Sequence, residues 1–189
     1  ALGDDNWGNW QIEDATIYNG IWLYALMGYA DARGQLDQLF RTPEVYYYAQ
    51  YYLNLLSPAG VVPDLGDSWW TQNWQHFFVF FEAAAAHVKD PALAWAAQQI
   101  AGRFIDFSTA NNVGLGCFLL DAARWGGAAI EPVAPTNLSG EVMEDMQGKK
   151  VVFRSGWKPD STYLLLNYRD EGDGGMNFRD YLRDSIPVE

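Results

Sequence analysis

Apolar residues recur at helical spacing through the first 130 residues of the chain. Hydrophobic side chains three and four residues apart form one face of a helix. On this basis we expect six helical segments, at residues 13–30, 35–41, 42–56, 69–87 or 71–87, 90–104 and 116–125. The first segment is apolar on every side, which is typical of a helix buried among other helices.

Two of these helices have clear start signals. Thr42 and Asp90 are residue types that cap a helix N-terminus, and each precedes a proline, which suits the first helical position. His87 falls near the end of a helix, where the helix dipole favours a cation. Helices joined by short loops favour antiparallel pairs, layered as a toroid or a solenoid.

After residue 130 the pattern changes to strands and turns. Residues 130–139 contain two prolines and are typical of a linker, whereas residues 151–154 and 161–168 have strand composition and flank a turn at 156–160. So few strands form no stable sheet unless they pack on the helices. The predicted fold class is therefore α+β, mainly α. We expect a helical domain at 1–130, a linker at 131–150 and the beginning of a β domain at 151–189, all within a longer polypeptide.

The composition of the chain argues against several classes of protein. The 189 residues are 49% hydrophobic and 19% charged, so the chain can bury a sizeable core. Its 12 Lys and Arg against 24 Asp and Glu give a net charge of −12, which argues against nucleic-acid binding. A single cysteine, Cys117, excludes an internal disulfide and a Cys-rich zinc module. No apolar run of the membrane-spanning kind occurs.

Aromatic residues are unusually frequent. Nine Trp, eleven Tyr and ten Phe make up 16% of the chain. A large core accounts for part of this excess. Trp and Tyr are also amphipathic, and a surface that stacks on sugar rings needs both types.

Two Trp-rich segments combine indoles with polar groups. In residues 4–11 (DDNWGNWQ), amides lie beside indoles at a helix entrance, although Asn6 or Asn9 could equally be a helix cap. In residues 63–76 (PDLGDSWWTQNWQH), Asn73, Trp74 and His76 fall in the first turns of a helix if Thr71 caps it. A histidine exchanges protons near neutral pH, and the alternative for His76 is a structural role.

Other chemistry has less support in the sequence. Asp170, Glu171 and Asp173 could bind a hard cation, but their spacing departs from a calcium loop, and we interpret them as a solvated turn. No phosphate-binding loop, GxSxG, HExxH or CxxC motif occurs.

Three stretches resemble the heparinase II/III-like polysaccharide lyases: residues 6–13 (NWGNWQIE), 63–68 (PDLGDS) and, most specifically, 152–166 (VFRSGWKPDSTYLLL). The resemblance implies an (α/α) toroid followed by an antiparallel β-sandwich. It also implies a secreted or periplasmic enzyme that cleaves uronic-acid polysaccharides by β-elimination. The substrate partner would be an acidic polysaccharide or oligosaccharide. The resemblance implies no certain cofactor and leaves a divalent cation, Zn²⁺ or Ca²⁺, to the part of the sandwich beyond residue 189.

The resemblance also implies roles for individual residues. Asn6 lies where the family places the Asn that neutralises the substrate carboxylate, and Trp7 stands where many members have His. The helix after the 63–68 loop contains no Tyr, although the family's catalytic Tyr falls there, so His76 is the expected base. The expected substrate contacts are Trp7, Trp10, Gln11, Trp69, Trp70, Asn73 and Trp74.

Two alternatives remain open from the sequence. One is a glycoside hydrolase on a similar toroid, with Glu13 or Asp14 paired with Asp64 or Asp67 as its two carboxylates. The other is a carbohydrate-binding protein that has kept the fold and lost the base.

Overall fold

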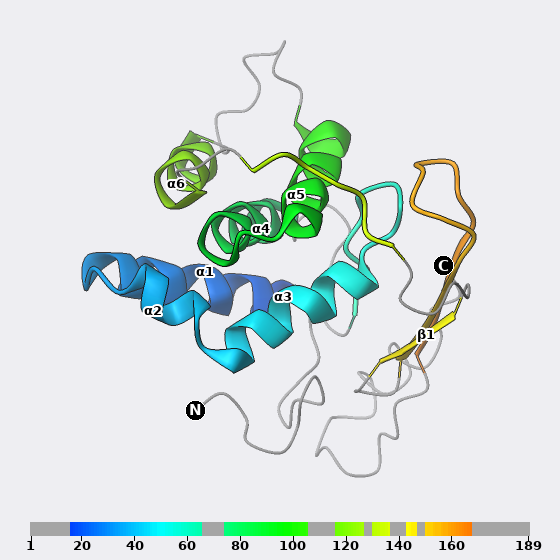
Figure 1. Cartoon of the computed structure of the whole chain (residues 1–189), viewed down its shortest axis with the longest axis horizontal. Coiled ribbons are helices and arrows are strands. Elements are labelled where there is room, and N and C mark those ends of the chain that lie inside the picture. Colours follow the sequence, from blue (N-terminus) through cyan, green and yellow to red (C-terminus); the bar gives the residue numbers. More distant parts are fainter. Residues whose placement is uncertain are drawn as a thin grey trace.

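The computed structural model describes residues 16–65, 74–105, 116–126, 130–136, 143–146 and 150–167. These residues form six helices and one three-stranded antiparallel sheet (Figure 1). The expected class, mainly helical with a small sheet, is confirmed. In chain order the elements are α1 Thr16–Ala32, α2 Leu36–Phe40, α3 Pro43–Leu55, α4 Trp74–Val88, α5 Pro91–Phe104, α6 Gly116–Gly126, β1 Met143–Met146, β2 Lys150–Arg154 and β3 Tyr163–Asn167.

Helix α4 is the centre of the helical part. It packs against α1, α2 and α3 on one side and against α5 and α6 on the other (Figure 1). Its phenylalanines Phe77, Phe80 and Phe81 are fully buried, and the Phe77 ring lies 4.4 Å from that of Tyr52 on α3 between ring centroids. Burying one such side chain contributes about 1.5–3 kcal/mol, so α4 provides much of the core.

The two proline-marked helix starts have different capping. Asp90 caps α5 as expected, because its side chain accepts a hydrogen bond from the backbone N–H of Ala92 at 2.9 Å. Thr42 occupies the N-cap position of α3, but its hydroxyl donates to the carbonyl of Gln38 in α2 instead. The expected side-chain cap at Thr42 is therefore wrong, because the preceding turn of helix offers the hydroxyl an acceptor.

The prediction that α1 is buried on every side is also wrong. Its inner face is buried, but four large apolar side chains on its outer side are exposed: Tyr18, Ile21, Trp22 and Tyr29. The reason is that α1 lies at the edge of the described helices and packs mainly on α4 and α2. Apolar periodicity alone does not say how many neighbours a helix has.

The sheet has the order β1-β2-β3 with antiparallel neighbours. Strands β2 and β3 match the two predicted strands, and Phe153 pairs with Leu164 across them. The sequence pattern did not predict β1, which pairs with β2 through Met143 and Phe153 and lies inside the expected linker at 131–150. The sheet therefore begins before the predicted domain boundary.

The sheet packs on the helices, as its small size requires. Alternate residues of β2 face the helical part, so that Lys150, Val152 and Arg154 are buried. The hydroxyl of Tyr163 donates to the carbonyl of Leu55 at 2.7 Å, and Arg154 donates to the carbonyl of Asn54. Both acceptors belong to the last turn of α3, where helix carbonyls have no partner within the helix.

Candidate functional site

Most of the expected site residues lie outside the described part of the chain. These are Asn6, Trp7, Trp10, Gln11, Trp69, Trp70 and Asn73, together with Glu13, Asp14 and Asp67 of the hydrolase alternative. The structure describes the positions of Trp74, His76 and Asp64.

Trp74 does not line an exposed surface. Its side chain is 8% exposed, and its indole stacks on the ring of Phe104 at 5.4 Å between centroids and 7° between planes. In the structure Trp74 packs α4 against the end of α5, and its expected place in a sugar-stacking wall stays a prediction. The sequence did not distinguish this core role, because tryptophan serves both purposes.

His76 lies near the start of α4, where this helix closely approaches α1 at Gly20. A Cβ at Gly20 would lie 3.1 Å from the Cβ of His76, so glycine is the residue that permits this approach. The ring is half-buried, and its Nδ1 is buried with no hydrogen-bond partner among the described residues. Burial lowers the pKa of His76, because the charged form loses solvation. The ring is therefore neutral near pH 7 and able to accept a proton.

Two aromatic rings flank His76 at right angles. Tyr24 of α1 and Phe118 of α6 lie at centroid distances of 5.7 Å and 5.1 Å from the imidazole, both edge to face. The hydroxyl of Tyr24 donates a hydrogen bond to a carboxylate oxygen of Asp121 on α6. Burial, and then Asp121, raise the pKa of Tyr24, so this hydroxyl keeps its proton at neutral pH.

His76 and Tyr24 thus form a pair whose pKa values are shifted in opposite directions by their surroundings. Such a pair provides a proton acceptor and a proton-bearing group side by side, which is the arrangement used in acid–base catalysis. The sequence singles out His76 but gives no sign of Tyr24 and Asp121. Tyr24 and Asp121 are 97 positions apart, and neither has a local motif, so only the packing of α1 against α6 identifies them.

The loop that begins the second Trp-rich segment, residues 63–65, is hydrogen-bonded to the start of α1. The Thr16 hydroxyl donates to the carbonyl of Pro63 at 2.8 Å and accepts from the N–H of Leu65 at 3.1 Å. The N–H of Thr16 also donates to the carbonyl of Leu65 at 3.0 Å. Residues 16 and 20 are neighbours on one helix face. This loop and His76 therefore lie next to each other along α1.

Asp64 belongs to this loop, and the pKa of its carboxyl is shifted. Burial raises the pKa of its carboxyl to about 6. A carboxyl of this kind remains partly protonated close to neutral pH, as a general acid must. Of the carboxylates expected for a hydrolase, Asp64 is the one that the structure describes.

Replacing Asp64 with asparagine should stabilise the protein at neutral pH by about 1 kcal/mol, after allowance for its partial exposure to solvent. A raised carboxyl pKa means that the folded state binds the proton more tightly than the unfolded state. The contribution of Asp64 to the free energy of unfolding therefore falls as pH rises from about 4 to about 6.

Chemical denaturation at several pH values measures this dependence on Asp64. In Asp64→Asn the fall across that range should be smaller, whereas Asp160→Asn, in the exposed turn between β2 and β3, should retain it. An equal pH dependence in Asp64→Asn and the unmodified protein would contradict this assignment.

Among the described residues, no group of three or more His, Cys, Asp and Glu side chains is arranged to hold a metal ion. In the same residues, no helix combines the length and the apolar character needed to cross a membrane.

Comparisons of the chain with protein-family models, with curated proteins and with solved structures give no match. The case for a function therefore depends on the residues around His76 and on the resemblance of the three sequence stretches.

Proposed function

We propose that the protein is a polysaccharide lyase that cleaves a uronic-acid polysaccharide by β-elimination, with His76 as the base. The observation that carries the proposal is the surroundings of His76. It is a neutral, half-buried imidazole whose buried Nδ1 has no hydrogen-bond partner in the described part of the chain, and it lies edge to face against a tyrosine that keeps its proton.

The proposed chemistry uses two proton transfers between the protein and the substrate. His76 removes the proton at C5 of the uronate, the electron pair forms the C4–C5 double bond, and the C4–O bond breaks. Tyr24 lies next to the base and supplies a proton to the leaving oxygen, and the proton on His76 then returns to the Tyr24 oxygen, which restores both groups. Before substrate binds, Asp121 accepts the hydrogen bond of the Tyr24 hydroxyl, which turns to the leaving oxygen for the reaction. Asn6 remains the proposed partner of the substrate carboxylate, which must be neutralised before C5 becomes acidic.

The described residues next to the two Trp-rich segments support a sugar-binding surface near His76. The first leads into α1 at Thr16, and the second continues from Leu65, and these two residues are hydrogen-bonded to each other. Thr16 and Leu65, the described residues that continue these segments, thus lie side by side at the start of α1. In the proposed enzyme, their indoles and amides form the sugar-binding surface.

The finer fold proposal is an (α/α) toroid followed by a β-sandwich. Its support is the layering of helices around α4 and the exposed outer side of α1, including Ile21 and Tyr29, which a further helix pair of a toroid would cover. A secreted or periplasmic location belongs to the same proposal.

The test is incubation of the full-length protein with uronate polymers, followed by the ultraviolet absorbance of the new double bond. We expect absorbance to develop with the unmodified protein and to fall to background in His76→Ala. Tyr24→Phe should lose most of the activity, whereas Tyr46→Phe, on the exposed side of α3, should retain it. Full activity in His76→Ala would remove His76 as the base.

The raised pKa of Asp64 favours one second candidate, a glycoside hydrolase with Asp64 as general acid. The same incubation distinguishes the two reactions. New reducing ends without the double-bond absorbance, lost in Asp64→Asn, would support hydrolysis. Tight binding of the polymer without cleavage would instead indicate a carbohydrate-binding protein that lacks both reactions.

A further inference from the structure

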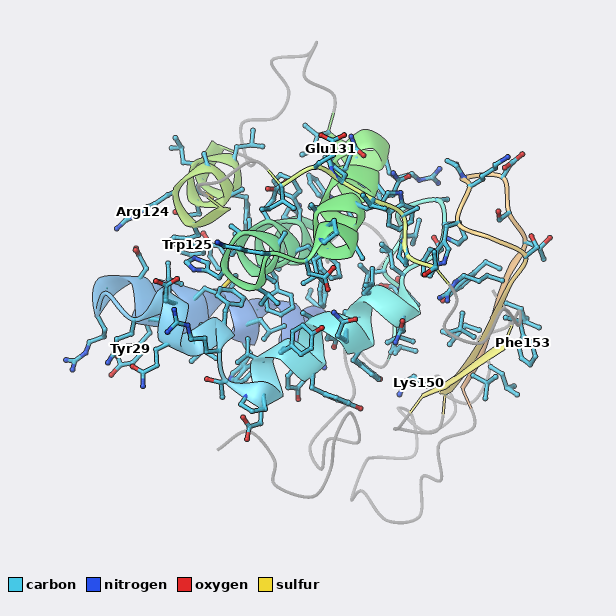
Figure 2. The ribbon with its side chains drawn as sticks, viewed as in Figure 1. Tyr29, Arg124, Trp125, Glu131, Lys150 and Phe153 are labelled. Atoms are coloured by element: carbon cyan, nitrogen blue, oxygen red, sulfur yellow. The ribbon has the colours of Figure 1, made fainter. Side chains whose placement is uncertain are left out.

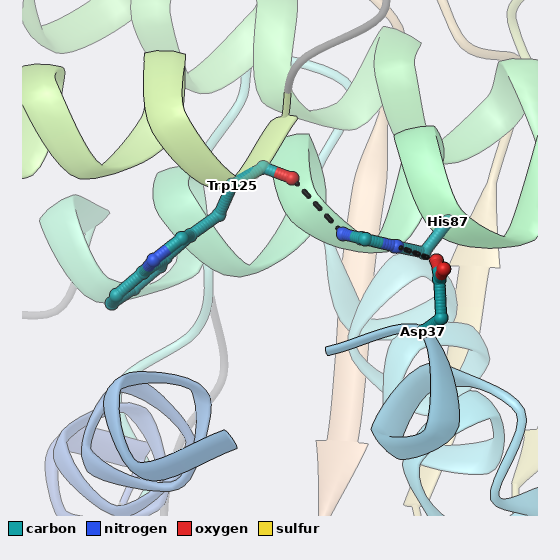
Figure 3. Close-up of polar contacts among 3 residues, drawn as sticks. All are labelled: Asp37, His87 and Trp125. Carbon is teal, nitrogen blue, oxygen red and sulfur yellow. Dashed lines mark hydrogen bonds and ion pairs between the residues drawn. The ribbon is translucent and has the colours of Figure 1, made fainter. Parts of the chain in front are cut away.

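A second histidine, His87, joins three helices at the far end of α4. Its Nδ1 lies 2.6 Å from a carboxylate oxygen of Asp37 on α2, and its Nε2 lies 3.1 Å from the carbonyl oxygen of Trp125 on α6 (Figure 3). The ring also stacks on Phe40 of α2 at 5.2 Å between centroids and 6° between planes. His87 therefore does more than place a cation at the end of its own helix, which was its expected role.

Both ring nitrogens of His87 face acceptors. A backbone carbonyl can only accept a hydrogen bond, so Nε2 must donate to Trp125. The hydrogen bond with His87 lowers the pKa of Asp37, so its carboxylate also acts as an acceptor. The two contacts are satisfied together only when both nitrogens carry hydrogen.

We propose that His87 is a proton-dependent clamp that fixes the C-terminal end of α6 to α2 and α4. The clamp is closed when the imidazole carries both protons and opens when it loses one. Imidazoles exchange this proton near neutral pH. A carboxylate is a stronger acceptor than a carbonyl, so the remaining proton stays between His87 and Asp37. Trp125 then loses its donor, and the end of α6 is released as pH rises.

Several other charged groups surround this clamp. On α2, Arg41 acts on Asp37, and on α6, Arg124 pairs with Asp31 of α1 at 2.7 Å. Lys89 follows α4, and Glu82 of α4 lies close to Gly126 at the end of α6. Burial raises the pKa of Glu82, so the effect of this carboxyl must be separated from that of the clamp.

Release of α6 would affect the surroundings of His76 and Tyr24, because side chains of α6 contact both residues. Phe118, Asp121 and Trp125 of α6 contact His76 or Tyr24 from α4 and α1. Loosening the end of α6 would loosen this arrangement. The inference concerns the position of α6 alone and holds whether or not the protein is a lyase.

Hydrogen exchange of the amides of α6 tests the clamp in the full chain. Between about pH 5.5 and about pH 8, we expect their protection factors, corrected for intrinsic exchange, to fall about five- to tenfold in the unmodified protein. His87→Phe retains a ring that can stack on Phe40 but has no donor. It should therefore show the lower protection at both pH values.

Asp37→Asn is the decisive variant. Its amide can donate to a neutral Nδ1, so the single imidazole proton can stay on Nε2 and hold Trp125 at every pH. Protection of α6 should then be independent of pH, whereas Glu82→Gln should behave as the unmodified protein. Unchanging protection in the unmodified protein, or a pH-dependent fall that persists in Asp37→Asn, would overturn the proposal.

Discussion

Replacing Gly60 with alanine should lower the free energy of unfolding by about 3–5 kcal/mol. Gly60 follows α3 with a φ of 78°, in the left-handed region that residues with a Cβ adopt at a cost. A Cβ there would also lie 2.5 Å from the carbonyl oxygen of Gln99 and 2.6 Å from its carbonyl carbon. Both atoms are backbone atoms of α5, which cannot move aside without displacing the helix. The free-energy cost of the left-handed φ and the cost of the overlap with Gln99 therefore add.

Gly34 provides the matched control for Gly60. It too has a left-handed φ, of 65°, but nothing lies within 4 Å of the position that a Cβ would take. Gly34→Ala should therefore lower the free energy of unfolding only by the cost of a left-handed φ at alanine, about 1–2 kcal/mol. Denaturant unfolding of both variants measures the difference, which is the cost of pushing α5 away. Equal losses in the two variants would show that the contact with Gln99 is not tight.

The elements that local residue patterns define were predicted well. The start of α5 follows from Asp90 and Pro91, and the pairing of β2 with β3 follows from two apolar runs on either side of a turn. Strand β1 was missed because its sequence, MEDM, has little strand character by itself. It is a strand because β2 offers it a hydrogen-bonding edge.

Of the residues in the candidate site, only His76 could be predicted from the sequence. His76 is one of two histidines, and its proton chemistry singled it out. What supports its proposed role as a base, however, is its half-buried position between α1 and α6, with Tyr24 and Phe118 at its sides. Those neighbours come from segments far apart in the chain. The contacts of Trp74 and His87 could not be predicted from the sequence for the same reason, since each has its partner on another helix.

Arg154 links the helical part to the sheet. The guanidinium is buried, donates to the Asn54 carbonyl at the end of α3, and lies 4.0 Å from the centroid of the Trp157 ring. Figure 2 labels Lys150 and Phe153, which belong to the same strand as Arg154. Trp157 in turn packs edge to face on Trp95 of α5 at 5.3 Å. One cation therefore connects α3, the turn after β2 and, through an indole, α5.

Arg154→Ala should lower the free energy of unfolding by about 3–4 kcal/mol. The change removes a buried side chain, leaves the Asn54 carbonyl without this donor, and removes the cation from the face of Trp157. Arg154→Lys keeps a charge but lacks the planar group that stacks and donates at once, so it should recover only part of the loss.

Denaturant unfolding, followed by both tryptophan fluorescence and far-ultraviolet circular dichroism, measures the effect of Arg154→Ala. Lys158→Ala removes a cation from the exposed turn of the same hairpin and should change stability by less than about 0.5 kcal/mol. If the sheet depends on Arg154 for its position, the fluorescence transition of Arg154→Ala should precede the loss of helix, because Trp157 leaves α5 before the helices unfold. Coincident transitions with an unchanged midpoint would instead mean that Tyr163 and the buried face of β2 hold the sheet on α3 without the cation.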